Sequence, residues 1–331
     1  MQGTPCLKPC DLRLLATPAS LDRRKFLRTC AALAVTSATG RVLAQSPPSR
    51  TRLILLGTQG GPARRMKGMR KSPAQVILIN NVPYVVDCGY EVAAQLVNAG
   101  ISLNRLRYAF ITHHHSDHNA EYGNLVYLAW AAGLRTPVDS YAPPPLAEMT
   151  RAFWDSIKYD VDIRIKDQGA TDPRKLLVPH EITQNGVILQ NEDVKVSTTR
   201  VHHPPTDAYA YRFDAKDRSI VISGDTAYSE PLIELARGAD VLVHEIMYLP
   251  AMQKVFAGNP NAAKLLERVR SVHTTGEEVG RVAAQAGVKT LVLSHFLNTT
   301  PNDGLTDEHW TEGIREHFKG EVIVGSDLLE V

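Results

Sequence analysis

Short runs of apolar and β-branched residues alternate with stretches of helical periodicity along most of the chain. In the first half this pattern predicts strands at residues 52–56, 75–80, 83–87 and 107–111, and helices at 91–99, 120–132 and 146–157. In the second half it predicts strands at 194–201, 208–213, 219–222, 241–243 and 290–293, and helices at 231–236, 277–286 and 306–318. Two halves that each combine strands with helices favour an α/β fold in which two packed sheets carry helices on their outer faces.

The N-terminal residues do not follow this pattern. Arg23 and Arg24 open a basic box that is followed by a weakly apolar stretch and by small residues up to Ala44. This segment resembles a twin-arginine signal, which exports folded proteins across the bacterial inner membrane, whereas a disordered basic tail is the alternative. We expect a signal peptide at residues 1–44 that is removed in the periplasm, a linker at 45–51 and the mature domain at 52–331. No apolar run reaches the ~18 residues of a membrane span, so no membrane anchor is expected after cleavage.

Charge and cysteine content change once the signal is removed. Residues 1–44 contain seven Lys or Arg and two Asp or Glu, so the mature chain keeps 30 basic and 33 acidic residues, a net charge of −3. A slightly acidic body is not typical of a dedicated nucleic-acid-binding protein. Cys88 is the single cysteine left, which excludes an intramolecular disulfide and leaves the core and bound metal to stabilise the fold.

The strongest chemical signal is a His-x-His-x-Asp-His motif directly after a predicted strand. On extended backbone, His113 and His115 point the same way, and the following turn aims Asp117 and His118 towards a neighbouring position. Imidazole and carboxylate groups are ligands that suit zinc at neutral pH. Two ligand pairs with different directions predict a site for two metal ions.

This motif resembles the signature of the metallo-β-lactamase superfamily, and the later residues of the mature domain follow that family's order. The resemblance implies an αββα four-layer sandwich with two zinc ions in one active site. It implies that the first zinc is bound by His113, His115 and His203, the second by Asp117, His118 and His295, and that Asp225 bridges both. Mn²⁺ or Fe²⁺ could occupy the same ligand set.

Two features leave alternatives or secondary roles open. His202 is adjacent to His203, so the ligand could be either, although the Pro204-Pro205 pair and the aromatic strand that follow favour His203. A cluster of cations after a glycine-rich segment could receive an anionic substrate, although such runs are usually solvated loops. This cluster comprises Arg64, Arg65, Lys67, Arg70 and Lys71.

Further residues are similar to the ribonuclease Z branch, which includes arylsulfatases and phosphodiesterases. His273 precedes a predicted helix and lies 22 residues before His295. By resemblance, His273 contacts the phosphate or sulfate and protonates the leaving group, while a helix-capping role is the alternative. Asp87 and Glu245 match positions that orient metal ligands in this branch.

A bridging water between two zinc ions would have a pKa near ~7, so hydroxide would attack the ester while Asp117 steers its proton. Export and the net charge oppose a tRNA substrate, and residues 142–180 show no basic, glycine-rich arm. We therefore predict a binuclear zinc hydrolase that cleaves a small anionic sulfate or phosphate ester, with no stable nucleic-acid partner. The alternatives are a ribonuclease Z-type tRNA 3′-processing endonuclease, a lactonase and a non-catalytic metal-binding scaffold. A homodimer is open, because dimers are common in this branch.

Overall fold

The computed structural model describes residues 51–62, 68–297 and 303–331. These residues belong to one compact unit, Pro47–Val331. The predicted signal peptide and most of the predicted linker lie outside the described residues, so both stay predictions. Among the described helices, none is long and apolar enough to cross a membrane.

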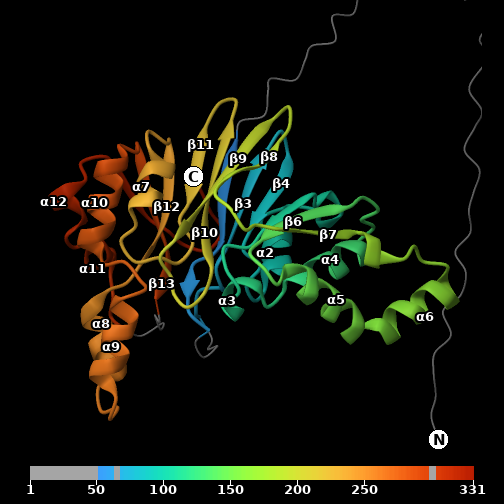
Figure 1. The fold of residues 1–331 in the computed structure, drawn as a ribbon, viewed down its shortest axis with the longest axis horizontal. Coiled ribbons are helices and arrows are strands. Elements are labelled where there is room, and N and C mark those ends of the chain that lie inside the picture. Colours follow the sequence, from blue (N-terminus) through green and yellow to red (C-terminus); the bar gives the residue numbers. More distant parts are fainter. Residues whose placement is uncertain (1–50, 63–67, 298–302) are drawn as a thin grey trace, which may run out of the picture. The chain divides into compact units, whose positions relative to one another are not determined.

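Strands from residues 52–181 and the C-terminal strand β15 build a seven-stranded sheet with the order β15-β1-β3-β4-β5-β6-β7 (Figure 1). Its strands are β1 (Arg52–Gly57), β3 (Ala74–Ile79), β4 (Val82–Val86), β5 (Tyr108–Phe110), β6 (Val138–Ala142), β7 (Leu177–Glu181) and β15 (Leu329–Glu330). Asn80 and Asn81 have positive φ angles in the tight turn between β3 and β4, which Asn tolerates well. The sheet's outer face packs against α2 (Val92–Asn98), α4 (Tyr122–Ala131) and α5 (Leu146–Ser156), and α6 (Lys158–Gln168) follows α5.

The second half builds an eight-stranded sheet with the order β14-β13-β12-β11-β10-β9-β8, in which β2 also pairs with β13. Its strands are β2 (Gln59–Gly60), β8 (Gly186–Gln190), β9 (Val194–Val201), β10 (Ala208–Ala215), β11 (Ser219–Ile222), β12 (Val241–Ile246), β13 (Thr290–Leu297) and β14 (Glu321–Val324). Its outer face packs against α7 (Glu230–Ala236), α10 (Gly276–Ala286) and α12 (Ile314–His317). The remaining helices are the short α3 (Ser116–Asn119), α8 (Leu249–Phe256), α9 (Ala262–Arg270) and α11 (Asp307–Thr311).

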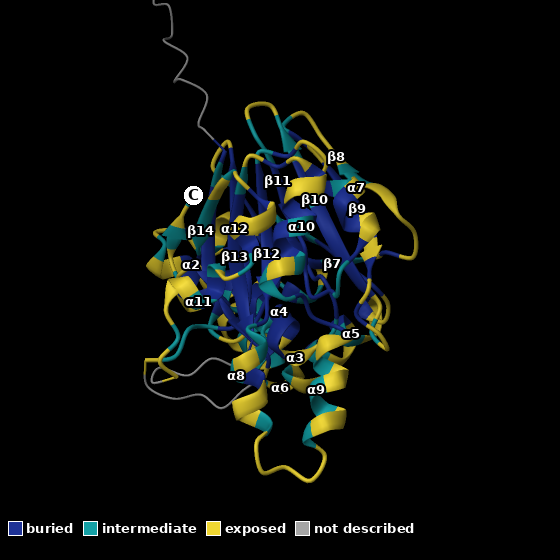
Figure 2. Ribbon diagram, turned by 90° about the vertical axis from the view of Figure 1, so that its left-hand side faces the viewer, coloured by how far each residue is buried: buried dark blue, intermediate teal, exposed yellow. Residues whose placement is uncertain are grey.

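The two sheets meet in a core rich in aromatic side chains. Phe110 on β5 stacks on Tyr141 with ring centroids 5.2 Å apart, and it meets Phe213 of the other sheet edge-on at 5.1 Å. The inner faces of both sheets are buried, whereas the outer faces of the helices are exposed (Figure 2). Helix, sheet, sheet and helix layers therefore form the expected αββα sandwich, which confirms the predicted fold class.

One helix that was predicted as continuous is interrupted in the structure. Residues 306–318 form two short helices, α11 and α12, because Glu312, with a ψ of 129°, and Gly313, with a φ of 77°, interrupt the helical path. The sequence pattern also missed α6, α8 and α9. Helix α6 is polar around most of its circumference, and Val161 is its one buried residue. It therefore lacks the apolar stripe from which an amphipathic helix is predicted.

The inter-sheet core gives a stability prediction. Phe110→Ala should lower the free energy of unfolding by about 3–5 kcal/mol, because the side chain is fully buried between three aromatic rings and leaves a cavity. Urea unfolding followed by circular dichroism measures the change. Val187→Ala, at a side chain that is 57% exposed, is the control and should shift the value by less than about 0.5 kcal/mol. Equal effects of the two substitutions would contradict this account of the core.

Candidate metal centre

The predicted site residues come together at one edge of the two sheets. Strands β11, β12 and β13 run parallel, so their carboxyl ends reach the same edge, where open α/β sheets place their ligands. The carboxyl end of β5 in the other sheet meets them there. This edge receives His113, His115, Asp117 and His118 after β5, His203 after β9, Asp225 after β11, Glu245 on β12 and His295 on β13.

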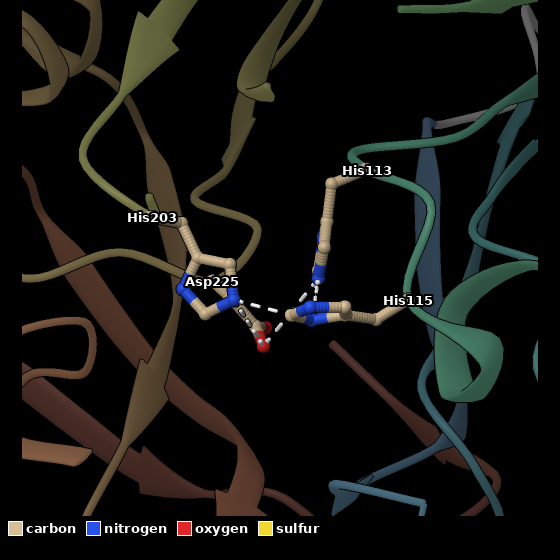
Figure 3. Close-up of side chains that lie close together, drawn as sticks. All are labelled: His113, His115, His203 and Asp225. Carbon is tan, nitrogen blue, oxygen red and sulfur yellow. Dashed lines mark hydrogen bonds and ion pairs between the residues drawn. The ribbon is translucent and has the colours of Figure 1, made fainter. Parts of the chain in front are cut away.

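One group of potential ligands combines both sheets (Figure 3). Nε2 of His113 lies 2.9 Å from Nδ1 of His115, and Nε2 of His203 lies 3.2 Å from the same nitrogen. Asp225 completes this group. His113 and His203 are buried, whereas His115 is exposed and leaves one side of the group open to solvent.

A second group adjoins the first and is buried throughout. Nε2 of His118 lies 3.2 Å from Nε2 of His295, and Asp117 Oδ2 lies 3.5 Å from each of these nitrogens. The backbone N–H of Gly61 donates to the same Asp117 oxygen at 2.8 Å. Two of the three ligand atoms therefore come from the short helix α3 and the third from strand β13 of the second sheet.

Asp225 faces both groups with different oxygens. Its Oδ1 lies 3.1 Å from Nε2 of His295 and 3.3 Å from Nε2 of His118. Its Oδ2 lies 3.8 Å from Nε2 of His113 and 3.9 Å from Nε2 of His203. Oδ1 is buried and has no hydrogen-bond partner among the described residues. A buried carboxylate oxygen without a donor fits a cation at this position.

Neighbouring groups fix the orientation of the histidines. Asp87 accepts a hydrogen bond from Nδ1 of His118 at 2.8 Å, and its other oxygen accepts one from the backbone N–H of Thr112. Nδ1 of His203 donates to the carbonyl of Val272 at 2.9 Å. Such contacts set the tautomer and leave Nε2 free to bind a metal. Asp87 and His295 also have positive φ angles, 62° and 49°, a strain that is typical of functional sites.

The buried carboxylates at this edge of the sheets favour a bound cation. Four carboxylates at this edge are between 2% and 4% exposed: Asp87, Asp117, Asp225 and Glu245. Within the described part of the chain, their ion pairs are all to histidines and none is to Lys or Arg. Buried carboxylates without positive partners are costly, so they are normally paired or bound to metal. The donor set of imidazoles and carboxylates therefore fits bound metal ions.

The pKa values of His113 and His203 agree with metal binding, whereas that of His118 is shifted the other way. Burial lowers the pKa of His203 to about 4 and the pKa of His113 well below its ordinary value. Both rings are thus neutral near pH 7, as metal ligands must be. Burial also opposes charge on His118, but the surrounding carboxylates, Asp225 first, raise its pKa.

His273 forms a dyad with Glu245 beside the two groups. Nδ1 of His273 donates to Oε2 of Glu245 at 2.8 Å, and the other Glu245 oxygen accepts from the backbone N–H of Thr226. Burial opposes protonation of His273, but Glu245 raises its pKa to about 9. His273, Asp117 and Asp225 line one cleft of about 190 Å³, so the imidazolium faces the same space as the candidate ligands.

The structure distinguishes the two adjacent histidines geometrically. His203 is 2% exposed and joins the first group, whereas His202 is exposed to solvent. Its own backbone N–H reaches the hydroxyl of Thr226 instead. This arrangement favours His203 as the ligand.

The predicted basic cluster has a different role in its described part. Arg70 donates to Thr58 and to the carbonyl of Gly325, and it covers the ring of Phe296, while Lys71 pairs with Glu91. These two side chains therefore stabilise the fold. Arg64, Arg65 and Lys67 lie outside the described residues.

Sequence reasoning missed the contribution of the glycine-rich segment. A Cβ at Gly60 would lie 2.6 Å from Nδ1 of His295, so this position admits only glycine. The next residue, Gly61, holds Asp117 through its backbone N–H. The pairing of β2 with β13, which brings this segment to the site, joins residues far apart in the chain and leaves no local signal.

The fold and the His/Asp groups together define a metal-dependent hydrolase, and comparisons with known proteins agree. A model of the "Beta-lactamase superfamily domain" matches residues 83–296. Ribonuclease Z of Mycobacterium sp. (strain KMS) is 30% identical, with 84% of this chain and 95% of that protein covered. Ribonuclease Z of Mycobacterium bovis (strain BCG / Pasteur 1173P2) is 27% identical, with 84% and 97% covered. The chain belongs to the metallo-β-lactamase superfamily, in its ribonuclease Z branch.

Solved structures support the same fold. The metallo-β-lactamase fold protein YhfI from Bacillus subtilis superposes with a TM-score of 0.62 at 19% identity, covering 86% of this chain and all of that one. Human tRNase Z, short form, gives a TM-score of 0.60 at 20% identity, covering 85% of this chain and 98% of that one.

The expected partner must be corrected. We expected a small anionic ester and no stable nucleic acid, but the curated relatives named above are ribonucleases that align over nearly their whole length. The net charge of −3 was the wrong criterion, because it sums the whole surface and does not say where cations gather.

The two adjacent histidines allow a matched test of metal binding. His203→Ala should remove about one metal ion per chain, because His203 Nε2 is one of the converging atoms of the first group. Metal content after dialysis, measured by inductively coupled plasma mass spectrometry, checks this. His202→Ala is the control and should retain the full content. If His202→Ala loses metal and His203→Ala does not, the geometric assignment is wrong.

Proposed function

We propose that this chain is a zinc-dependent phosphodiesterase of the ribonuclease Z kind, which cleaves a phosphodiester bond of RNA. The observation that carries the proposal is a pair of His/Asp groups that share Asp225 and open, together with His273, into one cleft. The relatives named ribonuclease Z supply the class of bond. Export through the N-terminal segment stays a separate prediction.

In this proposal Asp225, whose two oxygens face different His groups, would contribute to holding both of two zinc ions. His113, His115 and His203 would hold the first, and Asp117, His118 and His295 the second. When bound, zinc ions lower the pKa of water and neutralise charge that develops on phosphate oxygens.

Two side chains of the chain itself would handle protons. Although burial opposes its charge, His118 and His295 lower the pKa of Asp117 to about 2, so Asp117 stays an acceptor that can orient an attacking water. His273 engages Glu245 through Nδ1, so its Nε2 is the atom that can donate a proton to the leaving oxygen. One acceptor and one donor thus line the same cleft.

A direct test uses the full-length chain loaded with zinc and a 3′-extended tRNA precursor. We expect endonucleolytic cleavage that chelation abolishes, and Asp117→Ala should lower kcat/KM by at least about 10²-fold. Gel analysis of the labelled RNA measures the rate, and His202→Ala is the control that should keep it. Failure of the zinc-loaded protein to cut this or any other RNA would overturn the proposed function. Equal cleavage by Asp117→Ala would identify a contaminating nuclease.

The role of His273 is tested by varying the leaving group. The ribose oxygen of RNA needs a proton as it departs, whereas the p-nitrophenolate of bis-p-nitrophenyl phosphate does not. His273→Ala should therefore lower kcat on RNA roughly 10²–10⁴-fold but change kcat on the nitrophenyl ester by less than about tenfold. Stopped assays on both substrates measure the two rates. Equal losses on both would assign His273 to substrate positioning rather than proton donation.

A further inference from the structure

The helices α8 and α9 form a hairpin that projects from the body of the domain (Figures 1 and 2). Met252 on α8 is buried with Met247 and Leu297, and Leu266 and Val269 on α9 pack against this small cluster. The hairpin has its own apolar interior, so its outward side chains are held on a defined scaffold.

The base of this hairpin is part of the metal centre. Val269 lines the cleft together with His273, whose backbone N–H donates to the carbonyl of Val269 at 3.1 Å. The carbonyl of Val272 accepts from His203, and Arg268 donates to the carbonyl of Pro204. The carboxyl end of α9 therefore lies at the rim of the cleft.

The charge of the hairpin is opposite to that of the rest of the mature chain. Residues 249–271 contain four cations and one acid, whereas the remainder of residues 45–331 has a net charge of −6. All four cations are exposed, and none forms an ion pair within the described part of the chain. Arg268 is engaged with Pro204, which leaves Lys254, Lys264 and Arg270 available to an anion.

The other projecting pair, α5 and α6, lacks this property. Residues 142–180 contain six cations and six acids. Four of the cations are paired with carboxylates of the same segment, as in the contacts of Lys158 and Arg174 with Asp162. This segment is neutral and its charges are largely satisfied, so it offers little attraction to a polyanion.

We propose that the α8–α9 hairpin binds the sugar-phosphate backbone of the RNA substrate and guides it into the cleft. This inference rests on the proposed function. Helix α9 is about 13 Å long, enough to follow several nucleotides of a single strand. A shallow hollow of about 470 Å³ along α9, lined by Ala263, Leu266, Glu267, Arg270 and Ser271, offers apolar surface to a base beside a cation.

The test compares two triple variants with equal changes of charge. K254E/K264E/R270E reverses the free cations of the hairpin, and R151E/K166E/K175E reverses three exposed cations of the other projecting segment. KM and kcat on the tRNA precursor, and kcat/KM on bis-p-nitrophenyl phosphate, are measured for both. Fluorescence anisotropy with the labelled precursor, at several salt concentrations and in the Asp117→Ala background, reports binding without cleavage.

We expect the hairpin variant to raise KM for RNA roughly ten- to a hundredfold, with an unchanged rate on the small ester. Its plot of log affinity against log salt should be shallower by about 2, since each lost contact with a single strand contributes about 0.7. In the control variant, KM for RNA should change by less than about twofold, and the salt dependence should stay close to that of the wild type.

The outcomes separate this inference from the proposed function. If the wild type cleaves RNA and both variants behave alike, the hairpin proposal is overturned and the proposed function stands. If the wild type binds RNA through the hairpin but does not cleave it, the proposed function falls and the hairpin remains an RNA-binding surface. Loss of activity on the small ester in the hairpin variant would indicate damage to the cleft and would overturn the guiding role.

Discussion

Four buried carboxylates at one edge of the sheets need positive charge, and no Lys or Arg of the described residues forms an ion pair with them. Asp225 is the extreme case, because it is 3% exposed and one of its oxygens lacks a hydrogen-bond donor among the described residues. Burying such groups without compensation costs several kcal/mol each. The surrounding features serve this need. Imidazoles converge on the carboxylates, Asp87 and Val272 accept hydrogen bonds that orient His118 and His203, and Asp87 and His295 have left-handed backbone.

The sequence predicted those parts of the fold and site that leave a local pattern. The His-x-His-x-Asp-His motif follows an apolar strand and sets four side chains by itself, so the structure brings them where the spacing predicted. Predicted strands also agree with the observed ones within a few residues. Gly60 and the α8–α9 hairpin were missed because their roles depend on contacts across the chain. The single helix predicted at 306–318 failed because Glu312 and Gly313 interrupt the helical path.

The substrate prediction failed for an electrostatic reason. Net charge describes the long-range field, whereas binding of a polyanion depends on where unpaired cations lie. In α5 and α6 most cations are neutralised by neighbouring acids one helical turn away, such as Asp160 beside Arg164. On α9 the single acid Glu267 forms no ion pair among the described residues, and the cations are exposed. The net charge of the whole chain therefore cannot distinguish the α5–α6 pair from the α8–α9 pair.

The division of the candidate ligands between the two sheets has a consequence for how the protein acquires metal. His113, His115, Asp117 and His118 come from the first half of the chain, and His203, Asp225 and His295 come from the second. Neither half holds a complete set, so tight binding requires that both sheets have already packed together. Metal supply in the compartment where the chain folds would then act together with the His/Asp ligand set in selecting the ion.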